Sequence, residues 1–218
     1  LGLVSTKHGA GTVVASWRER AGLDALAVLI GSLSPGDTAW HELVTSMLEV
    51  RRIIATEAIG LAAERRTEED LEQMQLLADA QRARVEDAVA FARGDIAFQR
   101  AVVRAARNVG LELLLNTFAR FPEEHPGLVE LLYDRREESL GFYDAIIALV
   151  RGGDGTAARE VTRNAFLSID EQWQKRHARG GAPKQSAQEP KKIAPRAALR
   201  QNPIRSIAAK CAKRSIRH

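Results

Sequence analysis

The chain has 218 residues, of which 45% are hydrophobic and 28% charged, a composition typical of a globular protein with one core, and disorder throughout is excluded. No stretch reaches the ~18 to 20 uncharged apolar residues of a membrane span, and no signal-peptide pattern opens the chain, so a cytoplasmic protein is expected. The single cysteine, Cys211, excludes an intrachain disulfide and a cysteine-based zinc site.

The net charge of +4 conceals two regions of opposite sign. Residues 180–218 hold 10 lysines and arginines against one acid, whereas residues 1–179 hold 22 basic and 27 acidic residues. The last part also contains four of the seven prolines and no apolar period, which predicts a disordered basic tail over 179–218. Such a tail fits either non-specific, salt-sensitive binding to nucleic acid or a merely solubilising extension.

The chain opens with a predicted β-hairpin and continues as helices. Two β-favouring runs, 3–6 and 12–14, flank a Gly-containing turn at Lys7 to Gly11. Beyond them the apolar residues recur at steps of three and four. The helices are expected over 23–30, 38–63, from Thr67 onward, 86–107, 109–121, 135–151, and after an N-cap at Asp154. This predicts an all-α, antiparallel bundle of six to seven helices.

Several polar residues interrupt the apolar stripes from the inside. Arg51 stands where the stripe of the long helix requires a core residue, and Asp95 and Gln99 lie one turn apart on the inner face of the 86–107 helix. Tyr143 adds a hydroxyl between apolar neighbours on a later helix. Buried polar groups of this kind need partners.

Two interpretations of these residues remain open. In the first, Arg51 and Asp95 form an internal ion pair, completed by Gln99 and Tyr143, with a purely structural role. In the second, they surround a small apolar-walled cavity in which the arginine receives a carboxylate or phosphate. No nucleotide-binding loop and no nucleophile paired with a base occurs, so an enzyme is not expected.

Several short strings, taken in order, resemble a known family. The opening Leu1 to Val4 and Lys7 to Val14 resemble the end of the recognition helix and the wing of a GntR-type winged-helix regulator. Four later strings resemble the effector-binding and dimerisation domain called FCD, namely Leu48 to Ile53, Leu61 to Arg65, Thr67 to Leu71, and Asp95 to Arg100. The resemblance implies a wing remnant over 1–16, a linker and short helix over 17–36, and an FCD domain over 37–178.

The resemblance also bears on metal and effector. Metal-binding members carry an aspartate and three histidines, whose positions here match Asp95, Gln99, Tyr143 and Ala165, so no metal cofactor is expected. Strings such as Leu140 to Tyr143 are similar to the metal-free, fatty-acid-responsive FadR subfamily, which implies an acyl-CoA or fatty-acid effector. Phe166 and Ile169 would narrow such a pocket, and a small organic acid held by Arg51 is the alternative.

The implied partners are an effector, operator DNA and a second copy of the chain. The expected ligand-binding residues are Arg51, Asp95, Gln99, Asn108, Tyr143 and Trp173. The expected DNA contacts in the wing are Lys7, His8, Gly9 and Thr12. Since a GntR-type regulator reads DNA with a helix preceding the wing, we expect this chain to be a fragment that dimerises and binds effector but binds operator poorly. The other possibility is a ligand-free helical interaction protein with a nucleic-acid-binding tail.

Overall fold

The computed structural model describes residues 4–7, 11–14, 37–119 and 135–177, together with the separate residues 19, 22, 25, 28–29, 32–34, 129 and 133. In this part of the chain the strands β1 (Val4–Lys7) and β2 (Gly11–Val14) pair antiparallel, with Val4 opposite Val14 and Lys7 opposite Gly11. The predicted 23–30 helix lies mostly outside the described residues, and the tail 179–218 lies wholly outside them.

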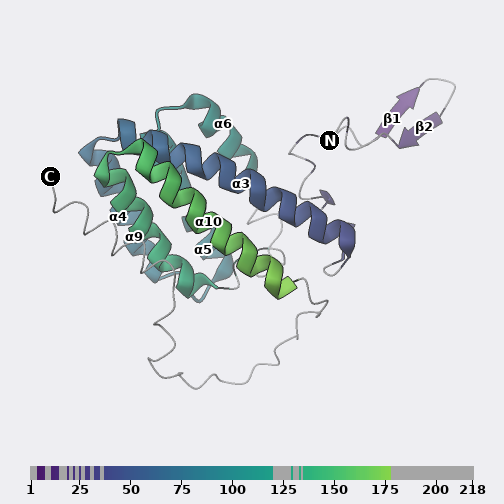
Figure 1. The fold of residues 1–218 in the computed structure, drawn as a ribbon. Helices are drawn as coiled ribbons and strands as arrows, with labels where there is room; N and C mark the ends of the chain where they lie inside the picture. Colours follow the sequence, from purple (N-terminus) through teal and green to yellow (C-terminus); the bar gives the residue numbers. More distant parts are fainter. Residues whose placement is uncertain are drawn as a thin grey trace, which may run out of the picture.

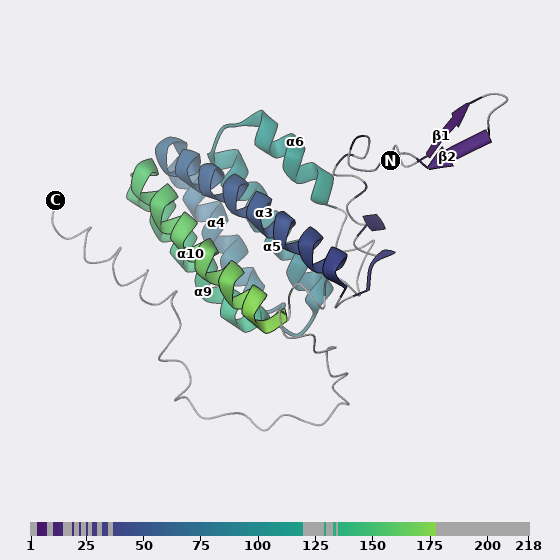
Figure 2. The same cartoon turned by 45° about the vertical axis from the view of Figure 1, so that its right-hand side comes forward.

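Six helices with defined bounds form the bundle in the described part of the chain, which confirms an all-α, six-helix bundle. Their bounds are α3 (Thr38–Arg65), α4 (Glu68–Arg82), α5 (Ala88–Ala105), α6 (Val109–Phe118), α9 (Arg136–Gly152) and α10 (Gly155–His177). None of them is long and apolar enough to cross a membrane. Figure 1 and Figure 2 show α3 and α10 side by side along one face, with α4, α5 and α9 behind them and α6 at one edge.

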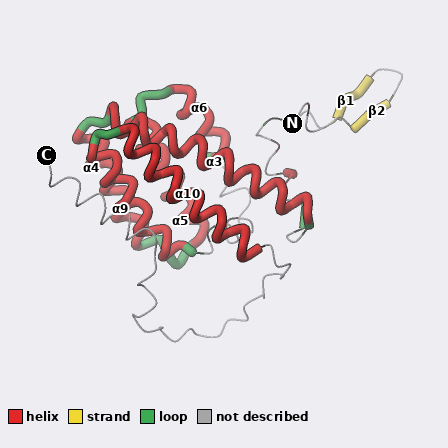
Figure 3. Tube along the Cα trace, viewed as in Figure 1, coloured by secondary structure: helices red, strands yellow, loops and turns green. Residues whose placement is uncertain are grey.

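The helix ends follow local capping chemistry. Thr67 and Asp70 form the predicted capping box of α4, each side chain bonding to the other's backbone N–H. Asp154 accepts a hydrogen bond from the N–H of Ala157 at 2.9 Å, as expected for the N-cap of α10. Gly153 ends α9 with φ of 75°, a left-handed conformation that favours glycine. The connections between α3 and α4 and between α9 and α10, where these caps lie, are therefore short (Figure 3).

The main core lies where α3, α4, α5 and α9 meet. Its large side chains are the fully buried Phe91, Phe98 and Met74, packed with Ile147 and Val150 of α9. A second, smaller cluster joins Trp40 and Val44 of α3 to Trp173 of α10. The helices therefore meet in a main core and in a separate, smaller cluster around Trp173.

The buried face of α3 differs from the predicted stripe. Trp40, Val44 and Ala58 are buried as expected, but Arg51 and Ile54 are not, while Thr56 and Ile59 are. The C-terminal half of α3 is covered by α5, α9 and α10 together, so a wider face is buried there than a single stripe provides. As a result Arg51 lies at the border of the core.

Candidate functional site

Asp95 of α5 is surrounded by three hydrogen-bond donors. The Tyr143 hydroxyl donates to Oδ1 at 2.8 Å, while the Tyr133 hydroxyl and Gln99 Nε2 donate to Oδ2 at 2.9 and 2.6 Å. Burial raises the pKa of Asp95 above its ordinary value, although the three donors and the charge of Arg51 oppose this shift. We call Asp95, Gln99, Tyr133, Tyr143 and Gln81, described next, the Asp95 cluster.

Gln81 supports the cluster from the last turn of α4. Its side chain is fully buried, and Nε2 donates to the Tyr143 hydroxyl and to the carbonyl of Phe91, both at 3.0 Å. Its Oε1 accepts from Arg84 at 3.1 Å. Gln81 was not among the predicted residues, although it continues the stripe of Leu71, Met74 and Ala78 by one more step of three.

Tyr133 reaches Asp95 from the segment before α9. Arg136 donates to the carbonyls of Val85 and Tyr133. Val129 is fully buried against Ala88 and Ala92, so this part of the chain packs against α5 and bonds to the turn before it. Burial and the neighbouring carboxylate raise the pKa of Tyr133, which keeps the hydroxyl a donor. Tyr133 was not predicted, although Val129, Tyr133 and Leu140 continue the helical spacing that reaches Tyr143.

Of the two interpretations, the one that pairs Arg51 with Asp95 is wrong about the partner, because Arg51 bonds to Asp170 of α10. Arg51 and Arg52 donate to the two oxygens of Asp170, at 3.2 and 2.6 Å. The Asp170 side chain is 5% exposed, whereas that of Arg51 is 46% exposed, and the Arg51 guanidinium lies 4.9 Å from the centre of the Phe166 ring. We call these four residues the Arg51 cluster.

The charges of the Arg51 cluster do not balance. Two guanidiniums share one carboxylate, so a net positive charge remains, and the longer and more exposed contact belongs to Arg51. Burial raises the pKa of Asp170, and both arginines oppose that shift. Arg51 also acts on the pKa of Asp95, so its charge reaches both carboxylates. Asp170 was not predicted. It stands one turn from both Phe166 and Trp173, so it lies on the same face of α10 as these two aromatic residues, and its spacing could have identified it.

The remaining predicted residues lie elsewhere. Asn108 caps α6, where its Oδ1 accepts from the N–H of Leu111 at 3.3 Å. Trp173 packs 5.9 Å from Trp40 and stacks on His41 at 5.5 Å, in the second apolar cluster. Of the expected DNA contacts, Lys7 and Thr12 belong to β1 and β2, while His8 and Gly9 lie outside the described residues.

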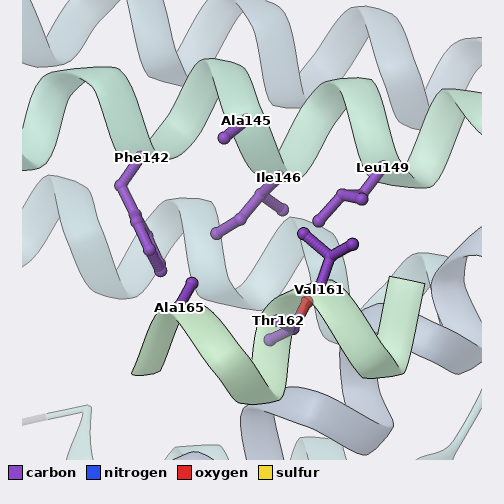
Figure 4. Close-up of a pocket in the computed structure, with 7 residues that line it drawn as sticks. All are labelled: Phe142, Ala145, Ile146, Leu149, Val161, Thr162 and Ala165. Carbon is purple, nitrogen blue, oxygen red and sulfur yellow. The ribbon is translucent and has the colours of Figure 1, made fainter. Parts of the chain in front are cut away.

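A small apolar cavity of about 10 Å³ lies between α9 and α10. Figure 4 shows Phe142, Ala145, Ile146 and Leu149 of α9 facing the residues that α10 contributes, which are Val161, Thr162 and Ala165. Such a volume holds about one water molecule. Phe142 meets Phe166 edge to face, with ring centres 5.1 Å apart, so the two helices are closely packed beside the cavity.

The position that matches the third family histidine, Ala165, lines this cavity and takes no part in the Asp95 cluster. Within the described ranges, no group of three or more histidine, cysteine, aspartate or glutamate residues is placed to hold a metal ion. Gln99 and Tyr143 stand instead as hydrogen-bond donors to Asp95. The side chains around Asp95 therefore form a hydrogen-bonded network.

Comparison with known proteins gives the family. Residues 46–167, more than half of the chain, match the FCD domain. Among solved structures, a GntR protein of Streptococcus agalactiae is similar in fold, with a TM-score of 0.50 and 18% identity over 78% of this chain and 75% of that one. No curated protein sequence matches. The chain therefore belongs to the FCD-domain family.

Proposed function

We propose that the chain is the sensing part of a ligand-responsive transcription regulator, and that an acidic effector binds inside the helical bundle at Arg51. Asp95, Gln99 and Tyr143 would border the bound molecule. Asn108 and Trp173 do not enter this proposal, because their side chains are used by a helix cap and an aromatic stack. The observation that carries the proposal is the unbalanced charge of the Arg51 cluster.

A carboxylate or phosphate on the effector would supply the missing negative charge. Arg52 holds Asp170 at 2.6 Å, so Arg51 can turn toward a ligand without leaving Asp170 alone. Its 46% exposed side chain is open to an approaching anion. A planar guanidinium also binds a carboxylate through two parallel hydrogen bonds, which a lysine does not.

The packing between α9 and α10 bears on the class of acid. An acyl-CoA or fatty acid needs an apolar channel, and the cavity of about 10 Å³ between these helices is far smaller than an acyl chain. A long chain would require Phe142 and Phe166 to separate. A small organic acid needs no such opening, and the closed packing favours it over the acyl effector of the FadR subfamily.

In the assembled regulator, we propose that two copies of the chain pair and that a wing formed by β1 and β2 contacts DNA in the cytoplasm, with Lys7, His8, Gly9 and Thr12 near the backbone or minor groove. Effector binding would then shift the population between two arrangements of the dimer. The basic residues after 179 would add affinity for phosphates that weakens with salt.

A thermal-shift screen of the full chain tests the effector proposal. The panel contains acyl-CoAs of several lengths, fatty acids, and small organic and sugar acids, each with EDTA and with divalent metals. Stabilisation by an acid that Arg51→Leu abolishes and Arg104→Leu retains would support the site, since Arg104 is exposed on α5. Equal binding by both variants would contradict it.

A second candidate function is a ligand-free helical interaction protein. It is favoured by one observation, namely that Arg51 already has a carboxylate partner in Asp170. In that case no acid in the panel would raise the melting temperature, and Arg51→Leu would only destabilise the fold. The same screen therefore separates the two functions.

A further inference from the structure

A fully buried glutamine, Gln81, joins three helices through its amide. It stands on α4, bonds to the backbone of α5 at Phe91, and bonds to Tyr143 on α9. Both hydrogens of Nε2 are thereby used, and Oε1 accepts from Arg84. A buried amide with every group satisfied can adopt only one orientation without losing bonds.

That orientation decides where the Tyr143 hydrogen points. A tyrosine hydroxyl has one hydrogen to donate and lone pairs to accept with. Because Gln81 donates to the Tyr143 oxygen, the hydroxyl hydrogen is not needed on that side and is available to Asp95 Oδ1, 2.8 Å away. If the amide were reversed, Oε1 would face Tyr143 and compete with Asp95 for the same hydrogen.

Two neighbours oppose the reversed amide. The Phe91 carbonyl needs a donor and Arg84 needs an acceptor, so reversing the amide would break both bonds at once. Gly94 of α5 also matters, because a Cβ at this position would collide with Gln81 Oε1 and lie only 2.6 Å from Arg84. The glycine therefore leaves the space in which the glutamine and arginine lie.

We propose that Gln81 is a positioning residue of the effector site, which directs the Tyr143 hydroxyl hydrogen at Asp95 and so fixes the orientation of that carboxylate. This inference rests on the proposed function, because it assumes that Asp95 borders the effector site. Gln81 acts through Tyr143 and does not meet the ligand. The polar or charged groups around Asp95 are Tyr133, Tyr143, Gln99 and Arg51, and Arg84 stands next to Gln81.

Carbon-13 NMR of the Asp95 carboxyl group in the full chain tests this role without any effector. The signal is assigned by its loss in Asp95→Asn, and its midpoint is followed with pH. Gln81→Glu keeps the shape but has at most one hydrogen, so it cannot donate to both Phe91 and Tyr143. We expect the Asp95 midpoint to rise by roughly one pH unit, since a donor to the charged form is lost.

Three further variants separate positioning from the added charge. Gln81→Met removes the amide without a charge and should raise the midpoint by less. Gln73→Glu puts the same charge on the exposed side of α4 and should leave the midpoint unchanged. Gly94→Ala should raise the midpoint because it displaces Gln81 while leaving the amide intact, and it serves if Gln81→Glu does not fold.

The decisive comparison is made in a Tyr143→Phe background. If Gln81 acts through the Tyr143 hydroxyl, the shift caused by Gln81→Glu falls by at least about half there, because only the direct charge effect persists. An equal shift in both backgrounds would overturn the positioning role, as would an unmoved midpoint in Gly94→Ala. Since no effector is present, this result stands or falls separately from the thermal-shift screen.

Discussion

Two carboxylates, the half-buried Asp95 and the buried Asp170, are stabilised in different ways in this bundle. Asp95 is held by neutral donors, two phenols and an amide, whereas Asp170 is held by two guanidiniums. Burial raises the pKa of both. The difference teaches that neutral dipoles fix a carboxylate in direction, while a surplus of positive charge leaves capacity for a second anion.

The largest expected effect comes from breaking the charged region. Asp170→Asn leaves two guanidiniums without a counter-charge, and we expect the free energy of unfolding to fall by about 3 kcal/mol. This value is at the low end for a buried pair because the Arg51 side chain is partly exposed to water. Urea unfolding followed by circular dichroism measures it. The control, Glu171→Gln, removes the exposed pair with Lys175 and should change stability by about 0.5 kcal/mol or less.

An intermediate effect is expected in the neutral region. Tyr143→Phe removes one hydroxyl that accepts from Gln81 and donates to Asp95, and we expect a loss of about 2 kcal/mol in the free energy of unfolding. Tyr133→Phe removes only the bond to Asp95 and is its matched control, with about half that loss. Equal losses in urea titrations of the two variants would mean that the bond to Gln81 contributes nothing.

The smallest expected effect is a change in pH dependence. Because the pKa of Asp95 is raised above 3.8 in the folded chain, the folded chain keeps this proton in a range where the unfolded chain has lost it. Stability from this group is therefore full at low pH and falls as the pH rises from 3.8 through the raised pKa, by up to about 1.4 kcal/mol per pH unit.

Asp95→Asn should flatten that fall, measured as melting temperature against pH. The control is Asp144→Asn, which removes a half-exposed carboxylate of α9. If the Asp95→Asn profile matched that of the unmodified chain, the proton on Asp95 would have no part in the pH dependence.

The helices were readable from the sequence because their apolar periods and caps are local. Thr67 with Asp70, and Asp154, mark starts that the structure confirms, since these side chains bond within their own first turn. The site was readable only in part. Asp95, Gln99 and Tyr143 were predicted as neighbours and do lie together, but Gln99 is exposed, so its predicted place on the inner face is wrong. The partner of Arg51 was not, because which carboxylate it meets depends on how α10 is placed along α3.

Residues that join distant parts of the chain were the ones missed. Gln81 and Asp170 each continue an apolar stripe, so the rule that singled out Arg51 would have found them. Tyr133 stands four residues after Val129 and seven before Leu140, so helical spacing marks it as well. Its bond to Asp95 spans 38 positions in the chain and depends on the packing of the whole bundle.

The contact between the Trp40 and Trp173 rings has an optical consequence. These are two of the three tryptophans in the chain, and they join the first and last helices of the bundle, with His41 stacked on one of them. Intrinsic fluorescence therefore reports on the register of α10 against α3 without any added label. A ligand that draws Arg51 away from Asp170 would change the tryptophan emission, whereas a rearrangement confined to Asp95 would leave the emission unchanged.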